Sequence, residues 1–122
     1  MKIRIKGNSI RLRLSKTEID TFATIGYLEE KTEFGNAKLV YALASDKDST
    51  ELNAVFAENK ITVFVPAPMH KEWTSTDIIG FENKFKIGGD RSLFILIEKD
   101  FVCLDNTFED QSDNFPNPNA VC

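Results

Sequence analysis

The sequence predicts one α+β domain made mainly of antiparallel β-hairpins with two short helices, and three observations support this fold class. Tight-turn signals recur between stretches in which apolar and polar residues alternate, as expected for half-buried strands joined by hairpins. Two stretches, at about residues 16–25 and 67–74, instead have helical spacing. The length of 122 residues fits a single domain, for which we expect a hairpin-rich core over 1–105 and an irregular acidic segment over 106–122.

The first fourteen residues are typical of a β-hairpin. Gly7-Asn8 is a two-residue turn of the glycine-first kind that suits a type II′ loop. That turn places Ile5 opposite Ile10 and Ile3 opposite Leu12 on one face. The opposite face then carries only polar and basic side chains, among them Arg4 and Arg11, which would face each other across the two strands.

The first helix is predicted by its end signals. Ser15 and Glu18 have the S-x-x-E spacing of a capping box, and Gly26 suits the position just after the last turn. In the second helix, Pro68 falls in the first turn, where proline is tolerated. Trp73 lies four residues after Met69, so the two side chains would share the inner side of this helix.

The remaining strands complete a curved antiparallel sheet of about seven to nine strands. Further hairpins are predicted around Gly35-Asn36 and Glu58-Asn59, and another strand over residues 79–87. The continuous apolar run at 93–97 is typical of a strand covered on both faces, so we place it at the sheet centre. Partial closure into a barrel stays open, since many short strands leave edges to protect. The sequence shows no internal repeat beyond the recurring hairpins.

Composition restricts the function classes. The net charge of −4 argues against non-specific binding to nucleic acid or to an anionic membrane. No apolar run is long enough for a membrane span, and basic residues interrupt the apolar residues after Met1, so no secretory signal is expected. We therefore expect a cytoplasmic protein without a cofactor. Its two cysteines would be thiols more readily than a disulfide in that reducing compartment, although metal ligation is also open.

The basic segment 1–16 requires a neutralising partner. Residues 1–16 carry six basic side chains and no acidic one, and like charges directly across strands are destabilising. Three neutralising partners are open: solvent, the acidic segment of the same protein, or an external anion such as a phosphate, a nucleotide, a nucleic acid or an acidic protein. The candidate basic residues are Lys2, Arg4, Arg11 and Arg13. The candidate acidic residues are Asp105, Glu109, Asp110 and Asp113.

A catalytic or metal-binding alternative rests on His70, Cys103 and Cys122. His70 is the only histidine and suits a general base or a metal ligand. The two cysteines stand nineteen residues apart, a spacing that matches no C-x-x-C knuckle. The sequence contains no P-loop, no G-x-S-x-G and no H-E-x-x-H, so no motif supports an enzyme.

Both ends of the sequence carry distinctive motifs. The opening M-K-I-R-I-K-G-N-S-I-R-L-R-L-S-K-T-E and the closing C-L-D…E-D-Q-S-D-N-F-P-N-P-N-A resemble a family of small uncharacterised bacterial proteins that is common in Bacteroidetes. The resemblance runs over nearly the whole sequence. It implies a bacterial, cytoplasmic, single-domain protein, and it supplies no catalytic residue.

The leading functional hypothesis is a non-catalytic binding or interaction module that uses the basic hairpin face. Its partner would be a small anion or a protein, and nucleic acid is not expected. The acidic segment would dock on its own domain or on a neighbouring subunit, so a homo-oligomer is left open. The alternative is a small enzyme or metal-binding protein that uses His70, Cys103 and the carboxylates of the acidic segment.

Overall fold

The computed structural model describes residues 1–101, which form eight strands and two helices. The predicted irregular segment 106–122, the four candidate acidic residues and both cysteines lie outside the described residues, so the predictions about them stay untested. The elements in chain order are β1 (Lys2–Lys6), β2 (Ser9–Leu14), α1 (Lys16–Ile25), β3 (Tyr27–Glu33), β4 (Lys38–Asp46), β5 (Asn53–Ala57), β6 (Lys60–Pro66), α2 (Ala67–Ser75), β7 (Gly80–Gly88) and β8 (Arg91–Lys99).

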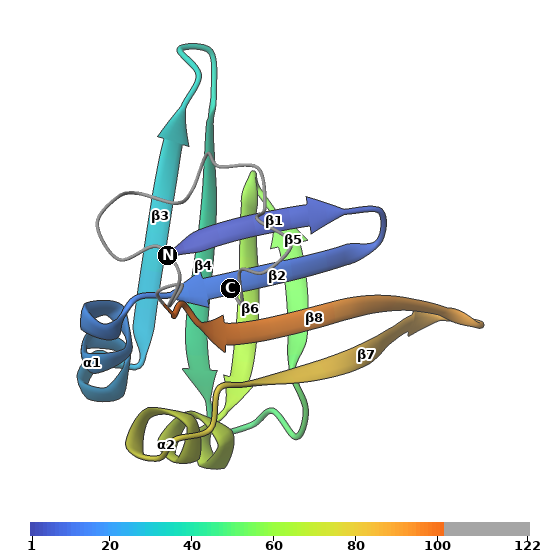
Figure 1. The fold of residues 1–122 in the computed structure, drawn as a ribbon. Helices are drawn as coiled ribbons and strands as arrows, with labels where there is room; N and C mark the ends of the chain where they lie inside the picture. The colour runs from blue at the N-terminus through green and yellow to red at the C-terminus, as the bar shows by residue number, and fades with distance from the viewer. Residues whose placement is uncertain (102–122) are drawn as a thin grey trace, which may run out of the picture.

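The strands form two four-stranded sheets that lie across each other (Figure 1). Sheet A has the order β1-β2-β8-β7, and sheet B has the order β3-β4-β6-β5. The α+β class and the three predicted hairpins are confirmed, and β7 and β8 form a fourth antiparallel hairpin. The prediction of a single curved antiparallel sheet is wrong, because the strands divide into two open sheets. Both sheets are mixed, because their central pairs β2–β8 and β4–β6 run parallel.

The first hairpin has the predicted register. Arg4 pairs with Arg11 and Lys2 with Arg13. Gly7 has a φ of 53°, and Asn8 is not among the residues with positive φ, as a type II′ turn requires. The strand at 93–97 is central as predicted, because β8 lies between β2 and β7.

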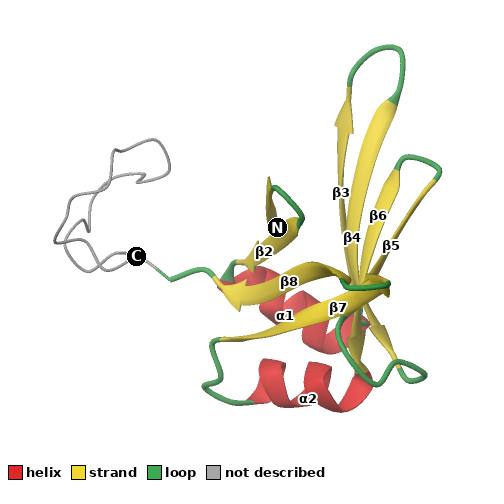
Figure 2. Cartoon of the chain, turned by 90° about the vertical axis from the view of Figure 1, so that its right-hand side faces the viewer, coloured by secondary structure: helices red, strands yellow, loops and turns green. Residues whose placement is uncertain are grey.

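The two helices pack against each other at one end of the molecule and connect the two sheets (Figures 1 and 2). Helix α1 occupies the predicted residues 16–25 and begins with a complete capping box between Ser15 and Glu18. Gly26 ends it in the left-handed conformation with a φ of 75°. Helix α2 covers 67–75, one residue longer than predicted. In residues 1–101, neither helix has the length and apolarity to cross a membrane.

The fold contains a repeat that the sequence analysis missed. The unit β1-β2-α1-β3-β4 has the same connectivity as β5-β6-α2-β7-β8, and each unit contributes one hairpin to each sheet. A constant shift of 51 residues relates the first hairpin to the third, since the pair Lys2–Arg13 corresponds to Asn53–Phe64. The same shift relates Phe22 of α1 to Trp73 of α2, both fully buried. The two units share a pattern of buried positions but few residue identities, and this hides the repeat in the sequence.

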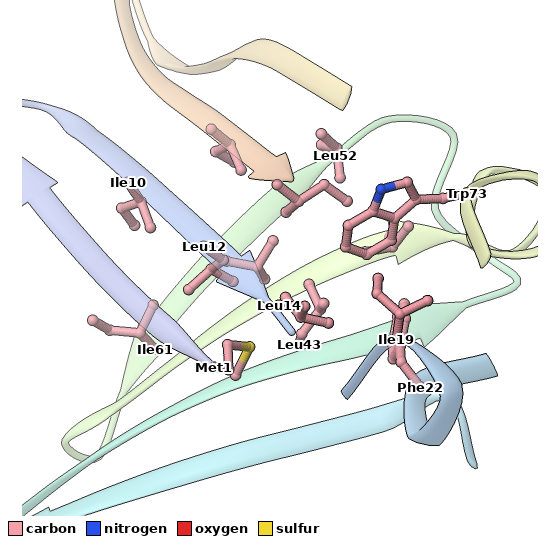
Figure 3. Close-up of a cluster of buried hydrophobic side chains, with 14 residues drawn as sticks. Met1, Ile10, Leu12, Leu14, Ile19, Phe22, Leu43, Leu52, Ile61 and Trp73 are labelled. Atoms are coloured by element: carbon pink, nitrogen blue, oxygen red, sulfur yellow. The ribbon is translucent and has the colours of Figure 1, made fainter. Parts of the chain in front are cut away.

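The core lies between the two sheets and is closed at one end by the helices (Figure 3). Alternate residues of β2 and β6 point inward from opposite sheets, so Leu12 and Leu14 belong to the same cluster as Val63 and Val65. Trp73 is fully buried, and its indole N–H donates to the carbonyl of Ile79 at 2.9 Å. Burial of an aromatic of this size without an unsatisfied donor fixes α2 against the sheets.

The amino-terminal ammonium of Met1 fastens β1 to α1 and sheet B. It donates to the carboxylates of Glu18 and Glu30, the latter at 2.8 Å, while the Tyr41 hydroxyl donates to the Met1 carbonyl at 2.8 Å. Burial lowers the pKa of the ammonium, but the hydrogen bonds and charges of the two glutamates outweigh it, so the pKa is raised. At Glu18, burial alone would raise the pKa, but the ammonium and the hydrogen bonds from Ser15 outweigh it, so the pKa of that carboxyl is lowered.

Candidate functional site

The outward side of the first hairpin collects five basic side chains. The inward residues Ile10, Leu12 and Leu14 are buried, so the residues between them face away from the core. We call this surface of sheet A the basic face. Its residues are Lys2, Arg4, Lys6, Arg11 and Arg13. Figure 1 shows sheet A in front of sheet B, with neither helix lying across the outward side of sheet A.

Four residues of the basic face line an open hollow of about 230 Å³ together with Ile3; they are Lys2, Arg4, Arg11 and Arg13. This is the set of basic residues that the sequence analysis named, and the structure brings all four together. The hollow is large enough for a phosphate or a carboxylate group, and its lining offers guanidinium groups, which bind such oxyanions in a bidentate way.

Glu98 of β8 holds two of these arginines. The parallel register places it beside Arg13, and its Oε1 accepts from Nε of Arg13 and from Nε of Arg11, both at 2.7 Å. The carboxylate side chain is 17% exposed. Burial alone would raise its pKa, but the hydrogen bonds and charges of both arginines outweigh it, so the pKa of Glu98 is lowered. The arginines are thereby fixed in place around a group that is ionised at neutral pH.

Asp100, just after β8, is the second counter-ion. Its carboxylate lies 3.0 Å from Nζ of Lys2 and 3.8 Å from Nη1 of Arg13. Arg4 makes no side-chain hydrogen bond or ion pair within residues 1–101, although it sits directly across from Arg11. Within residues 1–101, these two carboxylates pair with three of the five cations of the basic face, and the guanidinium of Arg4 on the hollow has no such partner.

The basic face borders an apolar centre on the same side of sheet A. Phe94 lies beside Ser9, and Leu96 lies beside Arg11. Both side chains are half-buried although they point away from the core. On the next strand, Lys84 pairs with Phe94 and Glu82 pairs with Leu96. The outward side of sheet A thus combines cations with a half-buried apolar strip.

Sheet B provides an internal comparison for the basic face. By the shift of 51 residues, each of its five basic residues has a neutral counterpart on the equivalent hairpin of β5 and β6. By the parallel registers, Glu98 corresponds to Ala44, because Arg13 pairs with Glu98 while Phe64 pairs with Ala44. The fold therefore forms these strands without the charges. The counterparts of Lys2, Arg4, Lys6, Arg11 and Arg13 are Asn53, Val55, Ala57, Thr62 and Phe64.

His70 has a packing role in the described structure. Its Nε2 donates to the carbonyl of Phe22 at 2.7 Å, in the last turn of α1, and its ring packs edge-on against the Phe22 ring with centroids 4.4 Å apart. Within residues 1–101, no group of three or more His, Cys, Asp and Glu side chains is arranged to hold a metal ion. Cys103 and Cys122 lie outside the described residues, so a role for them stays a prediction.

Glu98 and Asp100 are the site residues that sequence reasoning missed. The sequence shows the positive charge of residues 1–16, but its pattern points to residues 105–113 for the counter-ions. The counter-ions become evident only from the parallel pairing of β2 with β8, which places Glu98 beside Arg13. The alternation in either strand gives no information on which distant strand is its neighbour.

These features define a small two-sheet α+β domain with one basic outward face. Residues 1–119 match the family of unknown function DUF7009, and the chain belongs to this family. No curated protein and no solved structure matches the chain. The family membership agrees with the resemblance at both ends of the sequence and assigns no activity.

Proposed function

We propose that this protein is a non-catalytic binding module whose basic face takes an oxyanion group, a phosphate or a carboxylate, of a ligand or protein partner. One observation carries the proposal: sheet A has basic residues at five positions where the equivalent hairpin of sheet B is neutral. Because the fold does not require these charges, they are best explained by a ligand.

The geometry around Arg4 supports this function. Glu98 orients Arg11 and Arg13, while Arg4 has no partner within residues 1–101 and lines the same hollow. A preformed cluster of guanidinium groups loses little conformational entropy when it binds a planar or tetrahedral oxyanion. We propose no catalytic role for His70, because its Nε2 is engaged by a helix carbonyl. We also propose that the module acts in a bacterial cytoplasm.

The test compares Arg4→Gln with Arg91→Gln. Arg91 is an exposed arginine of β8 whose position alternates with the outward residues, so it belongs to the opposite side of sheet A. Isothermal titration with pyrophosphate should show binding to the natural protein and a loss of about tenfold or more for Arg4→Gln, since one charge-assisted hydrogen bond contributes roughly 1.5–3 kcal/mol.

The Arg91→Gln control should bind as the natural protein does, and the affinity should fall as NaCl is raised. Titrations with citrate as a carboxylate probe separate the two oxyanion classes. The proposal fails if neither pyrophosphate nor citrate binds, or if the two arginine variants lose affinity equally.

A further inference from the structure

The outward side of sheet A would suit a partner that carries both negative charge and apolar side chains. The basic face needs negative charges, and the adjoining Phe94 and Leu96 offer half-buried apolar surface that an apolar side chain would cover. A bare inorganic anion satisfies only the first need. An acidic peptide segment with aromatic residues satisfies both, since carboxylates pair with guanidinium groups while the rings pack on the apolar strip.

The sequence of this chain contains such a segment. Residues 105–122 include four acidic side chains and no Lys or Arg, and Phe108 and Phe115 lie among them. The segment begins six residues after Lys99, the last residue of β8, and Asp100, just after that strand, has its carboxylate beside Lys2 and Arg13. Its acidic residues are Asp105, Glu109, Asp110 and Asp113.

The distance to be covered is short. Asp105 comes five residues after Asp100, and five extended residues span up to about 17 Å. The step from β8 across β2 to β1 is about 10 Å, since adjacent strands lie about 5 Å apart. Tethering at this range gives a segment an effective concentration of about a millimolar, so even weak docking would be populated.

We propose that residues 105–113 dock on the basic face of the same chain and compete with the external oxyanion. The inference rests on the proposed function, because it names the regulator of that same site. The natural protein would then bind external anions more weakly than its basic face allows. An external partner must displace the acidic segment, so it binds only when its affinity or concentration is high enough to compete with that segment.

The test neutralises the acidic segment in the full chain with Asp105→Asn, Glu109→Gln, Asp110→Asn and Asp113→Asn together. A matched control removes four exposed carboxylates that make no side-chain hydrogen bond or ion pair within residues 1–101, with Asp20→Asn, Asp48→Asn, Glu72→Gln and Asp77→Asn. Both variants change the net charge equally. Titration with pyrophosphate should show affinity raised about fivefold or more in the first variant and within about twofold of the natural protein in the second.

Backbone amide chemical shifts provide an independent readout of docking. The shifts of Arg4 and Arg11 should move when the acidic segment is neutralised and stay in place in the control. Equal affinities and unmoved shifts, with Arg4→Gln still weakening pyrophosphate binding, would overturn the inference and leave the proposed function standing. Moved shifts with no anion binding in any variant would uphold the docking and overturn the proposed function.

Docking in trans gives a different result. If the segment sits on a neighbouring copy, light scattering will show a mass of two or more chains that falls to one when the segment is neutralised. That outcome overturns the arrangement within one chain. A mass of one chain at every concentration, together with the moved shifts, upholds it.

Discussion

Glu98 shows how a single residue can organise a charged surface. Arg11 and Arg13 are 30% and 32% exposed, and both donate to the same oxygen of a carboxylate that is more buried than either of them. The pairing limits repulsion between the arginines and fixes their directions. Because one carboxylate balances only one of the two guanidinium charges, the surface stays positive. This is the arrangement that an oxyanion site needs.

Replacing Glu98 with Gln should lower stability by about 1–3 kcal/mol at neutral pH, because two charge-assisted hydrogen bonds weaken and two half-buried cations lose their counter-ion. The pKa of Glu98 is lowered in the folded state, so its stabilising contribution is present above the ordinary glutamate pKa and is lost as pH falls through the folded value. Urea unfolding between pH 7 and pH 2 should show the difference from the natural protein shrinking toward acid.

Glu82→Gln is the matched control for this prediction, since Glu82 is exposed on the same side of sheet A and makes no ion pair within residues 1–101. It should unfold as the natural protein does. A Glu98→Gln protein as stable as the natural one at pH 7 would contradict the network, as would a difference that grows toward acid.

At the scale of elements, the sequence predicts the helix ends and hairpin registers, because residues close in the sequence determine them. The S-x-x-E capping box and Gly26 bound the first helix because a helix end is satisfied by residues within one turn of it. Hairpin registers followed from the turns at Gly7 and Glu58-Asn59, which show the expected positive φ values. The parallel neighbours could not be predicted, since β2 meets β8 more than eighty residues later and nothing in either strand specifies the other.

The same distinction applies to the candidate site. The four basic residues of the hollow could be named because they share one hairpin, and their cross-strand register followed from the turn. Their counter-ions could not, because Glu98 and Asp100 reach the hairpin only through the parallel pair. His70 was correctly placed on the second helix, but its partner is a carbonyl of the first, a contact set by helix packing.

The docking of β1 on α1 and sheet B yields a prediction about alkaline pH. The ammonium of Met1 has a raised pKa, so its contribution to stability is complete below its ordinary pKa and is lost as pH rises through the folded value. The natural protein should lose stability between pH 7 and pH 9.5. Glu30→Gln should be less stable at pH 7 and should lose less over this range, because Glu30 contacts the ammonium directly.

Urea unfolding at several pH values measures this effect. The range stops at pH 9.5 because the Tyr41 hydroxyl, whose pKa is raised by burial, would titrate in the unfolded chain at higher pH and add its own loss. Glu33→Gln, an exposed glutamate at the far end of β3, serves as the control. Parallel stability curves for the natural protein and Glu30→Gln would contradict the role of the ammonium.

At the scale of the whole molecule, the fold consists of two equivalent units whose outward faces have diverged. Inward positions stay apolar in both units, as at Leu12 and Val63, because both sheets contribute to one core. Outward positions are free of that constraint and differ in charge at every residue of the basic face. The duplicated architecture thus separates residues that maintain the fold from residues that are available for function.

This separation predicts the result of exchanging equivalent residues. Lys2→Asn with Arg4→Val gives β1 the residues that β5 carries at the same register positions. Stability should change by less than about 1 kcal/mol, because Lys2 makes only an exposed ion pair and Arg4 makes none within residues 1–101, while valine favours a strand. Pyrophosphate binding should fall at least tenfold, since two of the four cations of the hollow are removed.

A variant that adds two cations to the equivalent hairpin at exposed positions, Val55→Arg with Ala57→Lys, controls for the change of charge. It adds two cations to sheet B without touching the hollow, so it should fold and bind pyrophosphate as the natural protein does. A Lys2→Asn/Arg4→Val protein that unfolds would make the cations part of the folding requirement, against the equivalence of the two hairpins. One that folds and binds normally would place the anion elsewhere. Only a folded protein that has lost the anion supports a basic face that sheet A carries for function and sheet B lacks.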